Sequence, residues 1–339
     1  MKKRILGLLL CLLLLPSLSR GGEADPLSEV NSFVDTVVRN AVHAAQVARE
    51  ESAEPPRVID HINHPELWPD FAFDPGAELL EIWFPSIRDQ DAAILLYQDQ
   101  VWMLDCGDER ARNESVPLLK YLNISRIDRL INTHPHHDHL NGLYAIDAEI
   151  PVSELMICFP EDATQHMTAA MEYCKGSGIR VTPFGDEAVL PMGDGFVTMT
   201  AWLKVAGEES VNDRSAQFML SYGLCDMLFM ADMELRGQAQ LFEALPAESL
   251  AADILRYPHH GKKYMNDALY SAIDPQLVIV TNSPRISEIW ESTHFLDNKH
   301  ANVAYTHRGN DLIHLTTDGR HWLCEEETPD LSPWQVRYP

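Results

Sequence analysis

Cysteine is scarce in this chain, with six among 339 residues. One of them, Cys11, lies in an apolar run near the N-terminus, and no two form a Cys-x-x-Cys pair. The remaining number is odd, and Cys106, Cys158 and Cys324 lie in or at the end of apolar runs of strand type. We therefore expect buried free thiols and no disulfide framework.

Basic residues are few compared with acidic ones. The chain has 26 Lys and Arg against 51 Asp and Glu, which gives a formal net charge of -25 at pH 7. Duplex DNA is held mainly by Lys and Arg side chains that neutralise its phosphates. We therefore expect no tight binding of duplex nucleic acid, unless basic residues gather at one mouth. An enzyme that releases a small anionic product is less constrained by this charge.

Long hydrophobic runs are absent after the N-terminus. The apolar run Ile5–Leu15 follows Met1-Lys-Lys-Arg4 and precedes Pro16-Ser-Leu-Ser19, and it is shorter than the roughly 20 residues that span a bilayer. Charged, apolar and small-residue regions in this order are typical of a secretory signal peptide. We expect cleavage near Ser19, a secreted or cell-surface location and no stable membrane span afterwards. An uncleaved anchor is the alternative.

The remaining pattern predicts one N-terminal helix, a connector and a strand-rich domain. Apolar residues from Val30 to Val47 recur at spacings of three and four, which predicts an amphipathic helix, and prolines between Glu51 and Pro75 predict an irregular connector. Beyond it, strand-type runs outnumber helical ones, and the helices fall between groups of strands. This order favours an α+β fold with helices covering two packed sheets. The predicted strands lie at 79–84, 92–97, 101–105, 130–131, 155–159, 179–184, 196–203, 216–222, 227–231, 254–257, 277–281, 303–305, 312–316 and 321–324, and the predicted helices near 116–122, 161–175 and 234–244.

The densest chemistry follows the strand-type pair Leu130-Ile131, where His134–His139 holds four histidines and one aspartate. Alternate side chains of a strand share a face, so His134 and His136 can converge on one point and the Asp138-His139 pair on a second. Imidazoles and carboxylates bind Zn²⁺, and Mn²⁺ or Fe²⁺ accept the same donors. A solvated histidine-rich loop is the alternative, but the cluster sits mid-chain behind a strand pattern and is not a homopolymer.

Three further strand ends carry polar residues. Asp105 is suited to accept the N–H of a ligand histidine, or to occupy a turn. Asp232 ends a very apolar run, where a carboxylate is costly unless it is paired or metal-bound, although it could also cap the next helix. His259 and His260 follow the run at 254–257, and a partly exposed histidine turn is the alternative there.

These segments, in this order, resemble the metallo-β-lactamase superfamily of metal-dependent hydrolases. The nearest likeness is to the extracytoplasmic hydrolase domain of bacterial competence (DNA-uptake) proteins and their free-standing relatives. The matching segments are Asp105-Cys-Gly107, Thr133-His-Pro-His-His-Asp-His-Leu-Asn-Gly142, Asn212-Asp-Arg-Ser215, Ala231-Asp232, His259-His-Gly261 and Thr317-Asp-Gly319. The resemblance covers about Ala77–Glu326 and implies an αββα sandwich of two packed mixed sheets flanked by helices, with an N-terminal helical extension.

The resemblance also implies the ligands of two neighbouring metal ions, namely His134, His136, Asp138, His139, Asp232 and His260. The first ion would take His134 and His136, and Asp232 would bridge to the second. The sequence does not decide between His259 and His260, although His260 is favoured as the ligand and His259 as a substrate-facing residue. Asp105 would support a ligand from behind.

Two departures from the family pattern affect these expectations. Most members have a further ligand histidine before the bridging aspartate, whereas the histidine in that interval here, His166, falls inside the predicted helix at 161–175. We expect Asn212, Ser215 or water in its place, and a weaker or empty first site. Lys262 follows the His-His-Gly turn where the competence branch usually has serine, so it would bind an anion at the mouth or remain solvated.

Together these features predict a secreted hydrolase of phosphoesters, small or polymeric, that uses one or two Zn²⁺ ions to activate water. Asp138 and His259 are the catalytic candidates. The alternatives are hydrolysis of carbon esters, lactones or β-lactams, and a non-catalytic metal-binding module. The predicted divisions are a signal peptide at 1–19, the helix and connector at 20–76, the metallo-hydrolase domain at 77–326 and a tail at 327–339.

Overall fold

The computed structural model describes residues 57–205, 207, 209–308 and 312–335. The predicted signal peptide and N-terminal helix lie outside these residues. None of the helices in the described part combines the length and the apolar character that crossing a bilayer requires.

The first sheet has nine strands in the order β1-β16-β15-β2-β3-β4-β5-β6-β7. Its middle is antiparallel, whereas β4 to β7 run parallel to one another. The strands are β1 (Arg57–Asp60), β2 (Leu80–Phe84), β3 (Ala92–Tyr97), β4 (Gln100–Cys106), β5 (Arg129–Ile131), β6 (Glu154–Ile157), β7 (Arg180–Pro183), β15 (Leu312–Thr317) and β16 (His321–Glu327).

The second sheet has seven strands in the order β14-β13-β12-β11-β10-β9-β8. Here β8 to β11 are antiparallel and β11 to β14 are parallel. The strands are β8 (Val189–Met192), β9 (Val197–Trp202), β10 (Gln217–Tyr222), β11 (Cys225–Phe229), β12 (Ile254–Arg256), β13 (Leu277–Val280) and β14 (Val303–Tyr305).

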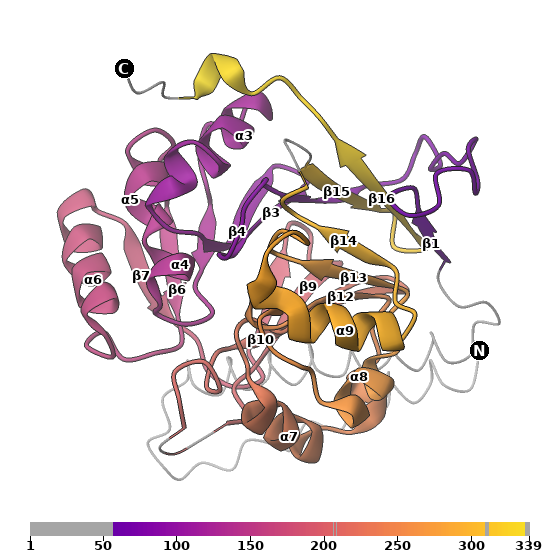
Figure 1. Ribbon diagram of the computed structural model, residues 1–339. Coiled ribbons are helices and arrows are strands. Elements are labelled where there is room, and N and C mark those ends of the chain that lie inside the picture. Colours follow the sequence, from indigo (N-terminus) through magenta and orange to yellow (C-terminus); the bar gives the residue numbers. More distant parts are fainter. Residues whose placement is uncertain (1–56, 206, 208, 309–311, 336–339) are drawn as a thin grey trace, which may run out of the picture. The chain divides into compact units, whose positions relative to one another are not determined.

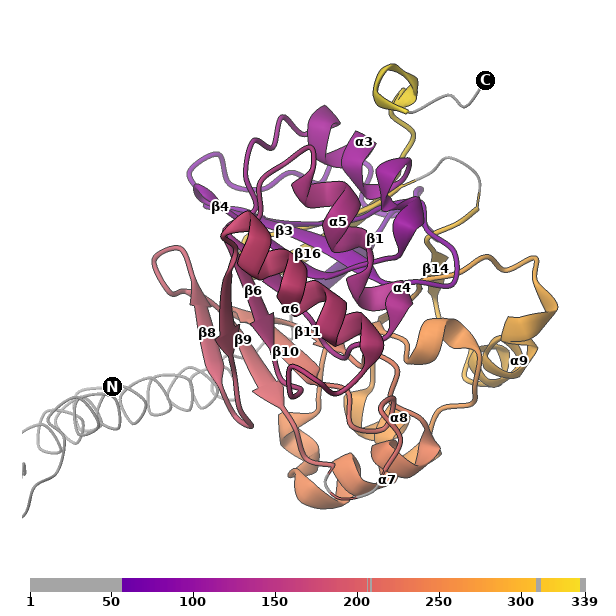
Figure 2. The same cartoon turned by 90° about the vertical axis from the view of Figure 1, so that its left-hand side faces the viewer.

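Helices cover the outer faces of both sheets. Figure 1 and Figure 2 show α3 to α6 on the side of the first sheet and α7 to α9 on the side of the second. The helices are α3 (Ser115–Tyr121), α4 (His137–Leu140), α5 (Gly142–Asp147), α6 (Gln165–Ser177), α7 (Leu235–Ala244), α8 (Asp267–Ile273) and α9 (Trp290–Asn298). Short 3-10 turns lie at Glu109–Arg112, Ala247–Ser249, His259–Gly261, Ser287–Ile289 and Ser332–Trp334. The predicted α+β fold of two packed mixed sheets flanked by helices is confirmed.

The apolar core has three layers because each sheet buries both faces. Leu95 of β3 points between the sheets and packs in one cluster with Phe218, while its neighbour Ile94 belongs to the cluster beneath α3 to α6. Leu228 and Leu241 pack in the third cluster, beneath α7 to α9. Successive side chains of a strand point to opposite faces, so apolar runs without polar alternation suit strands buried on both sides. The described cysteines are all free and four of them are buried, as predicted.

The predicted strands are found in the predicted order, but β8 and the helices α4, α5, α8 and α9 were not predicted, and α4 occupies part of the predicted histidine loop. The predicted connector contains β1, where Val58 and Ile59 are buried and which pairs in parallel with β16, so the irregular assignment is wrong there. This strand joins the sheet upstream of Ala77. Prolines on both sides concealed it, because proline usually marks loops and turns. Helix α6 begins later than predicted, because the Thr164 hydroxyl accepts the Met167 N–H at 3.1 Å and caps it.

Candidate metal centre

Parallel strands bring the histidine loop and Asp105 to one edge of the first sheet. Strands β4 and β5 are parallel neighbours, so Asp105 at the end of β4 lies beside the loop that follows β5. Strand β3 is antiparallel to β4, and its first residue Ala92 pairs with Cys106. The residue before it, Asp91, therefore reaches the same edge although it precedes its strand.

The second sheet supplies its polar residues in the same way. Strands β11, β12 and β13 are parallel neighbours, so Asp232, His260 and Thr281, which follow them, share one edge. Within this second set, the His259 N–H donates to the Ala231 carbonyl at 2.9 Å. The edges of the two sheets meet at this point. The site thus lies where the ends of both sheets converge, as in many sites built on α/β scaffolds.

Two groups of side chains could hold metal ions, and they share Asp232. One is His134, His136 and Asp232; the other is Asp91, His139, Asp232 and His260. Within each group, one donor atom per residue lies within 4.8 Å of the others. All are buried except His136, which is partly exposed. A carboxylate common to two ligand groups is the arrangement expected of a bridging residue.

The second group presents donor atoms that nothing satisfies among the described residues. His139 Nε2 lies 3.2 Å from Asp232 Oδ1, and His260 Nε2 lies 3.4 Å from Asp232 Oδ2 and 3.3 Å from Asp138 Oδ2. Yet His139 Nε2, His260 Nε2 and Asp232 Oδ1 are buried and make no hydrogen bond in the described structure. Buried polar atoms are normally paired. A divalent cation facing these nitrogens and oxygens would satisfy them, so the donor set fits a metal ion.

The first group has fewer ligands. His134 Nε2 lies 3.1 Å from His136 Nδ1 and 3.8 Å from Asp232 Oδ2. His166 does not join them, because it lies in α6 with its Nδ1 3.2 Å from Asn141 Oδ1. Among the described residues this group therefore has two imidazoles and one shared carboxylate.

Asp105 holds the His139 ring from behind. Its Oδ2 lies 2.7 Å from His139 Nδ1, and the carboxylate also accepts the Thr133 N–H at 2.8 Å and the Thr133 hydroxyl at 2.7 Å. A hydrogen bond from Nδ1–H fixes the tautomer and leaves Nε2 free to bind metal.

Asp91 and Arg256 are the residues that the sequence analysis missed. Asp91 Oδ2 lies 3.7 Å from His139 Nδ1, and Asp91 Oδ1 lies 3.8 Å from His260 Nδ1. Asp91 also forms an ion pair with Arg256. Arg256 was visible as a charged residue inside an apolar strand run, the same signal that singled out Asp232. Asp91 precedes its strand, whereas the other candidate site residues follow theirs.

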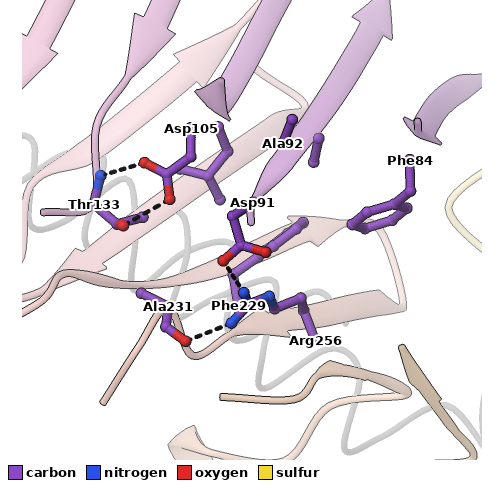
Figure 3. Close-up of a pocket in the computed structure, with 10 residues that line it drawn as sticks. Phe84, Asp91, Ala92, Asp105, Thr133, Phe229, Ala231 and Arg256 are labelled. Atoms are coloured by element: carbon purple, nitrogen blue, oxygen red, sulfur yellow. Dashed lines mark hydrogen bonds and ion pairs between the residues drawn. The ribbon is translucent and has the colours of Figure 1, made fainter. Parts of the chain in front are cut away.

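Figure 3 shows Asp91 and Arg256 facing each other and Asp105 turned toward Thr133. The cavity that these residues line, together with Phe84 and other apolar side chains, has a volume of only about 10 Å³. That volume suits about one water molecule, so this side of the site has no room for a substrate.

Burial and neighbouring charges shift the pKa values of the site residues in different directions. Burial lowers the pKa of His134 well below its usual value, which keeps the imidazole neutral. Burial alone would raise the pKa of Asp232, but His260 and His139 outweigh it and lower that pKa well below its usual value. Burial would lower the pKa of His139, but Asp232 and Asp105 raise it well above its usual value. Burial also lowers the pKa of Arg256 to about 9, so it remains a cation at neutral pH.

The backbone at the site is strained. Asp105, Ala231, His259 and His260 have φ values of 54°, 47°, 51° and 50°, in the left-handed region. Each such residue costs on the order of 1–3 kcal/mol and persists only where its surroundings over-determine it. Such strain concentrates at functional sites, which agrees with the convergence of ligand atoms here.

The sequence match identifies the family. Residues 88–280, more than half of the chain, match the model of the metallo-beta-lactamase superfamily. The chain belongs to the metallo-β-lactamase superfamily. No curated protein matches the chain.

Several solved structures are similar to this superfamily member. The metallo-β-lactamase fold protein YhfI of Bacillus subtilis is 14% identical, with a TM-score of 0.45 over 67% of this chain and 96% of its own. A diphosphatase of the PhnP family is 13% identical, with a TM-score of 0.44 over 70% and 97%. CmlA, a diiron β-hydroxylase from Streptomyces venezuelae, is 13% identical, with a TM-score of 0.45 over 73% and 55%. These likenesses concern the fold alone and decide neither substrate nor metal.

The remaining predicted site residues of this superfamily member occupy different surroundings. His259 is 15% exposed, with Nε2 3.8 Å from Asp232 Oδ2 and Nδ1 3.2 Å from Glu234 Oε1, whereas His260 is fully buried. The structure thus brings His260 into the ligand group and leaves His259 at its rim. Lys262 forms an ion pair with Asp89, which neutralises its charge locally.

Asn212 and Ser215 lie in a turn. This turn is beside the histidine loop, because the next residue, Ala216, donates its N–H to the Thr133 carbonyl at 2.9 Å. Their role as substitute ligands stays a prediction.

Proposed function

We propose that this superfamily member hydrolyses phosphoesters with the help of two neighbouring divalent ions. The observation that carries the proposal is Asp232, whose two oxygens face both ligand groups at 3.2 to 3.8 Å from their imidazole nitrogens. Divalent ions about 3.5–4 Å apart lower the pKa of water toward 7 and stabilise both the attacking and the leaving oxygen of an in-line displacement. A phosphoryl group makes fuller use of such a pair than a carbonyl group does, because both of those oxygens carry charge.

The side chains of the chain divide the remaining work. Asp105 accepts from His139 Nδ1 and keeps Nε2 of that ring turned toward the centre, while Thr281 Oγ1 lies 3.2 Å from His260 Nδ1 on the corresponding side of the second ring. Asp138, with Oδ2 3.3 Å from His260 Nε2, would complete the second ligand set as a carboxylate. His259 stands partly exposed near Asp232, where it can hold a proton beside the leaving group.

The location, metal and substrate class belong to the same proposal. The N-terminal segment at 1–19 and the motif likeness to competence-type domains support an extracytoplasmic enzyme. The imidazole and carboxylate donors support Zn²⁺, with Mn²⁺ or Fe²⁺ as alternatives. The net charge of -25 disfavours tight binding of duplex nucleic acid, so small phosphoesters or the ends of polymers are the expected substrates.

Hydrolysis of bis-p-nitrophenyl phosphate by the purified, metal-loaded protein tests this function. We expect turnover that falls by at least about 100-fold in Asp138→Ala, because a ligand carboxylate is lost. The exposed Asp162→Ala is the matched control and should keep wild-type activity. No turnover with Zn²⁺, Mn²⁺ or Fe²⁺, or equal turnover in Asp138→Ala, would reject the proposal. Faster hydrolysis of nitrocefin or of a lactone would assign the site to carbon esters or β-lactams instead.

A further inference from the structure

We propose that Arg256 is a positioning residue that pairs with Asp91 and so keeps its carboxylate out of the metal coordination shell. The inference rests on the proposed metal centre and adds a division of labour within it. Asp91 is near enough to the other ligands to be counted among them. Its role therefore depends on whether its oxygens pair with Arg256 or bind the metal ion.

The contacts of Arg256 hold its guanidinium in a position to pair with Asp91. The guanidinium is 3% exposed, pairs with Asp91 Oδ2, and donates to the Ala231 carbonyl and to Thr281 Oγ1, the last at 3.0 Å. A planar guanidinium has donors in a fixed fork, so a single Arg256 conformation serves all three acceptors.

These acceptors tie the two sheets together beneath the centre. Asp91 comes from the loop between β2 and β3, and its N–H donates to the Asp138 carbonyl at 3.1 Å. Ala231 lies in the left-handed region directly before Asp232. Arg256 therefore links the backbone that carries Asp138 to the backbone that carries Asp232, across the junction of the sheets.

The direction from which Asp91 approaches also matters. Its oxygens lie nearest the Nδ1 atoms of His139 and His260, whereas the atoms left without hydrogen bonds are the Nε2 atoms. A metal ion on the Nε2 side would be reached by Asp232 and Asp138 first. To join them, Asp91 would have to leave Arg256, and breaking one side of a buried ion pair is strongly disfavoured.

Cobalt substitution distinguishes the two roles of Asp91, because the visible absorption of bound Co²⁺ depends on coordination number and geometry. In otherwise wild-type protein, Asp91→Asn should leave the Co²⁺ spectrum unchanged. Arg256→Met should change it, with weaker bands as Asp91 enters the coordination shell. The double variant Arg256→Met/Asp91→Asn should recover the wild-type spectrum, and Arg256→Lys, which keeps the charge, should resemble wild type.

Arg129 provides the matched control, since it is a partly buried arginine paired with Glu154 outside the site. Arg129→Met should bind Co²⁺ with the wild-type spectrum. A changed spectrum in Asp91→Asn alone would overturn the proposal, as would an Arg256→Met spectrum identical to that of Arg129→Met. If Arg256→Met does not fold, the Asp91→Asn spectrum still decides. Failure of the wild-type protein to take up Co²⁺ would instead reject the proposed metal centre itself.

Discussion

Asp105 is the residue through which the first sheet controls a ligand of the second metal group. It holds His139 Nδ1 at 2.7 Å and is itself fixed by Thr133. We expect Asp105→Asn to weaken Zn²⁺ binding by about 10–100-fold, because an amide no longer favours the Nδ1–H tautomer. Competition with a chromophoric chelator measures the affinity. The control is Asp128→Asn, because the Asp128 carboxylate accepts the Val101 N–H. Equal Zn²⁺ affinities in the two variants would contradict the role of Asp105 in holding His139.

Glu114 makes the stability of the fold depend on pH at a distance from the metal ligands. Burial raises its pKa to about 7 from the usual 4.5, against the opposing effects of Arg110 and of a hydrogen bond from Gln90. A carboxyl group whose pKa is higher in the folded state stabilises the fold fully below pH 4.5, and this contribution is lost as the pH rises through 7. One pKa unit corresponds to about 1.4 kcal/mol of stability. Because Glu114 is partly exposed, the contribution of its raised pKa is reduced to about 1–2 kcal/mol.

Glu114→Gln should therefore be more stable than wild type at pH 8 by about 1–2 kcal/mol and equal to it near pH 4.5. Calorimetric unfolding at several pH values measures the difference. The exposed Glu161→Gln should follow the wild-type curve. Parallel curves for Glu114→Gln and wild type would show that the raised pKa is absent.

At the scale of elements, the close approach of Gly142 to the end of β4 holds the histidine loop in place. Its N–H donates to the Gly107 carbonyl at 2.9 Å, and a Cβ added there would lie 1.9 Å from the Cys106 carbonyl oxygen. The Cys106 thiol in turn donates to the carbonyls of His139 and Leu140 at 3.4 and 3.3 Å. Helices α4 and α5 thus pack against the end of β4, which carries Asp105.

Gly142→Ala should destabilise the fold by about 1–3 kcal/mol or more, because the clash is with backbone and cannot be relieved by a rotamer change. The melting temperature should fall by roughly 2–4 °C for each kcal/mol. Gly176→Ala is the control, since an added Cβ meets nothing within 4 Å in α6 and alanine favours a helix. A Gly142→Ala melting temperature at or above that of Gly176→Ala would refute the packing argument.

At the scale of the whole molecule, the site concentrates negative charge in an already acidic protein. Asp105, Asp138 and Asp232 are buried or nearly so and lie around the imidazoles, while the buried cation Arg256 is taken by Asp91. Buried carboxylates without a counter-charge are costly, and their mutual repulsion opposes folding. Bound divalent cations would offset this charge, so folding and metal binding should be coupled.

Removal of metal by a chelator should consequently lower the melting temperature, and stoichiometric Zn²⁺ should restore it. An ion present at 100 times its dissociation constant contributes about 2.7 kcal/mol to stability. Asp232→Asn should lose most of this dependence, because both ligand groups contain that residue. Differential scanning calorimetry with elemental analysis gives the shift and the number of ions. A chelator-independent melting temperature in a metal-free protein would contradict the coupling.

The sequence by itself determined the sandwich and the types of ligand. Apolar runs of strand length, and polar residues after them, indicated Asp105, His134–His139, Asp232 and the pair His259-His260 as candidates without any knowledge of strand pairing, and left the choice within that pair open. These signals are local, since burial on both faces and the cost of a charged residue at a strand end both act on neighbouring positions.

Only the tertiary structure decided which of these ends meet and what lies behind them. Asp91 reaches the site because β3 runs antiparallel to β4, so that the start of one strand lies beside the end of the other. Arg256 joins it across the junction of the two sheets. Strand pairing and sheet packing depend on contacts between residues far apart in the sequence, so spacing along the chain carries no record of them. The histidine cluster therefore predicted a metal centre, while the ion pair between Asp91 and Arg256 beside it became visible only in the folded molecule.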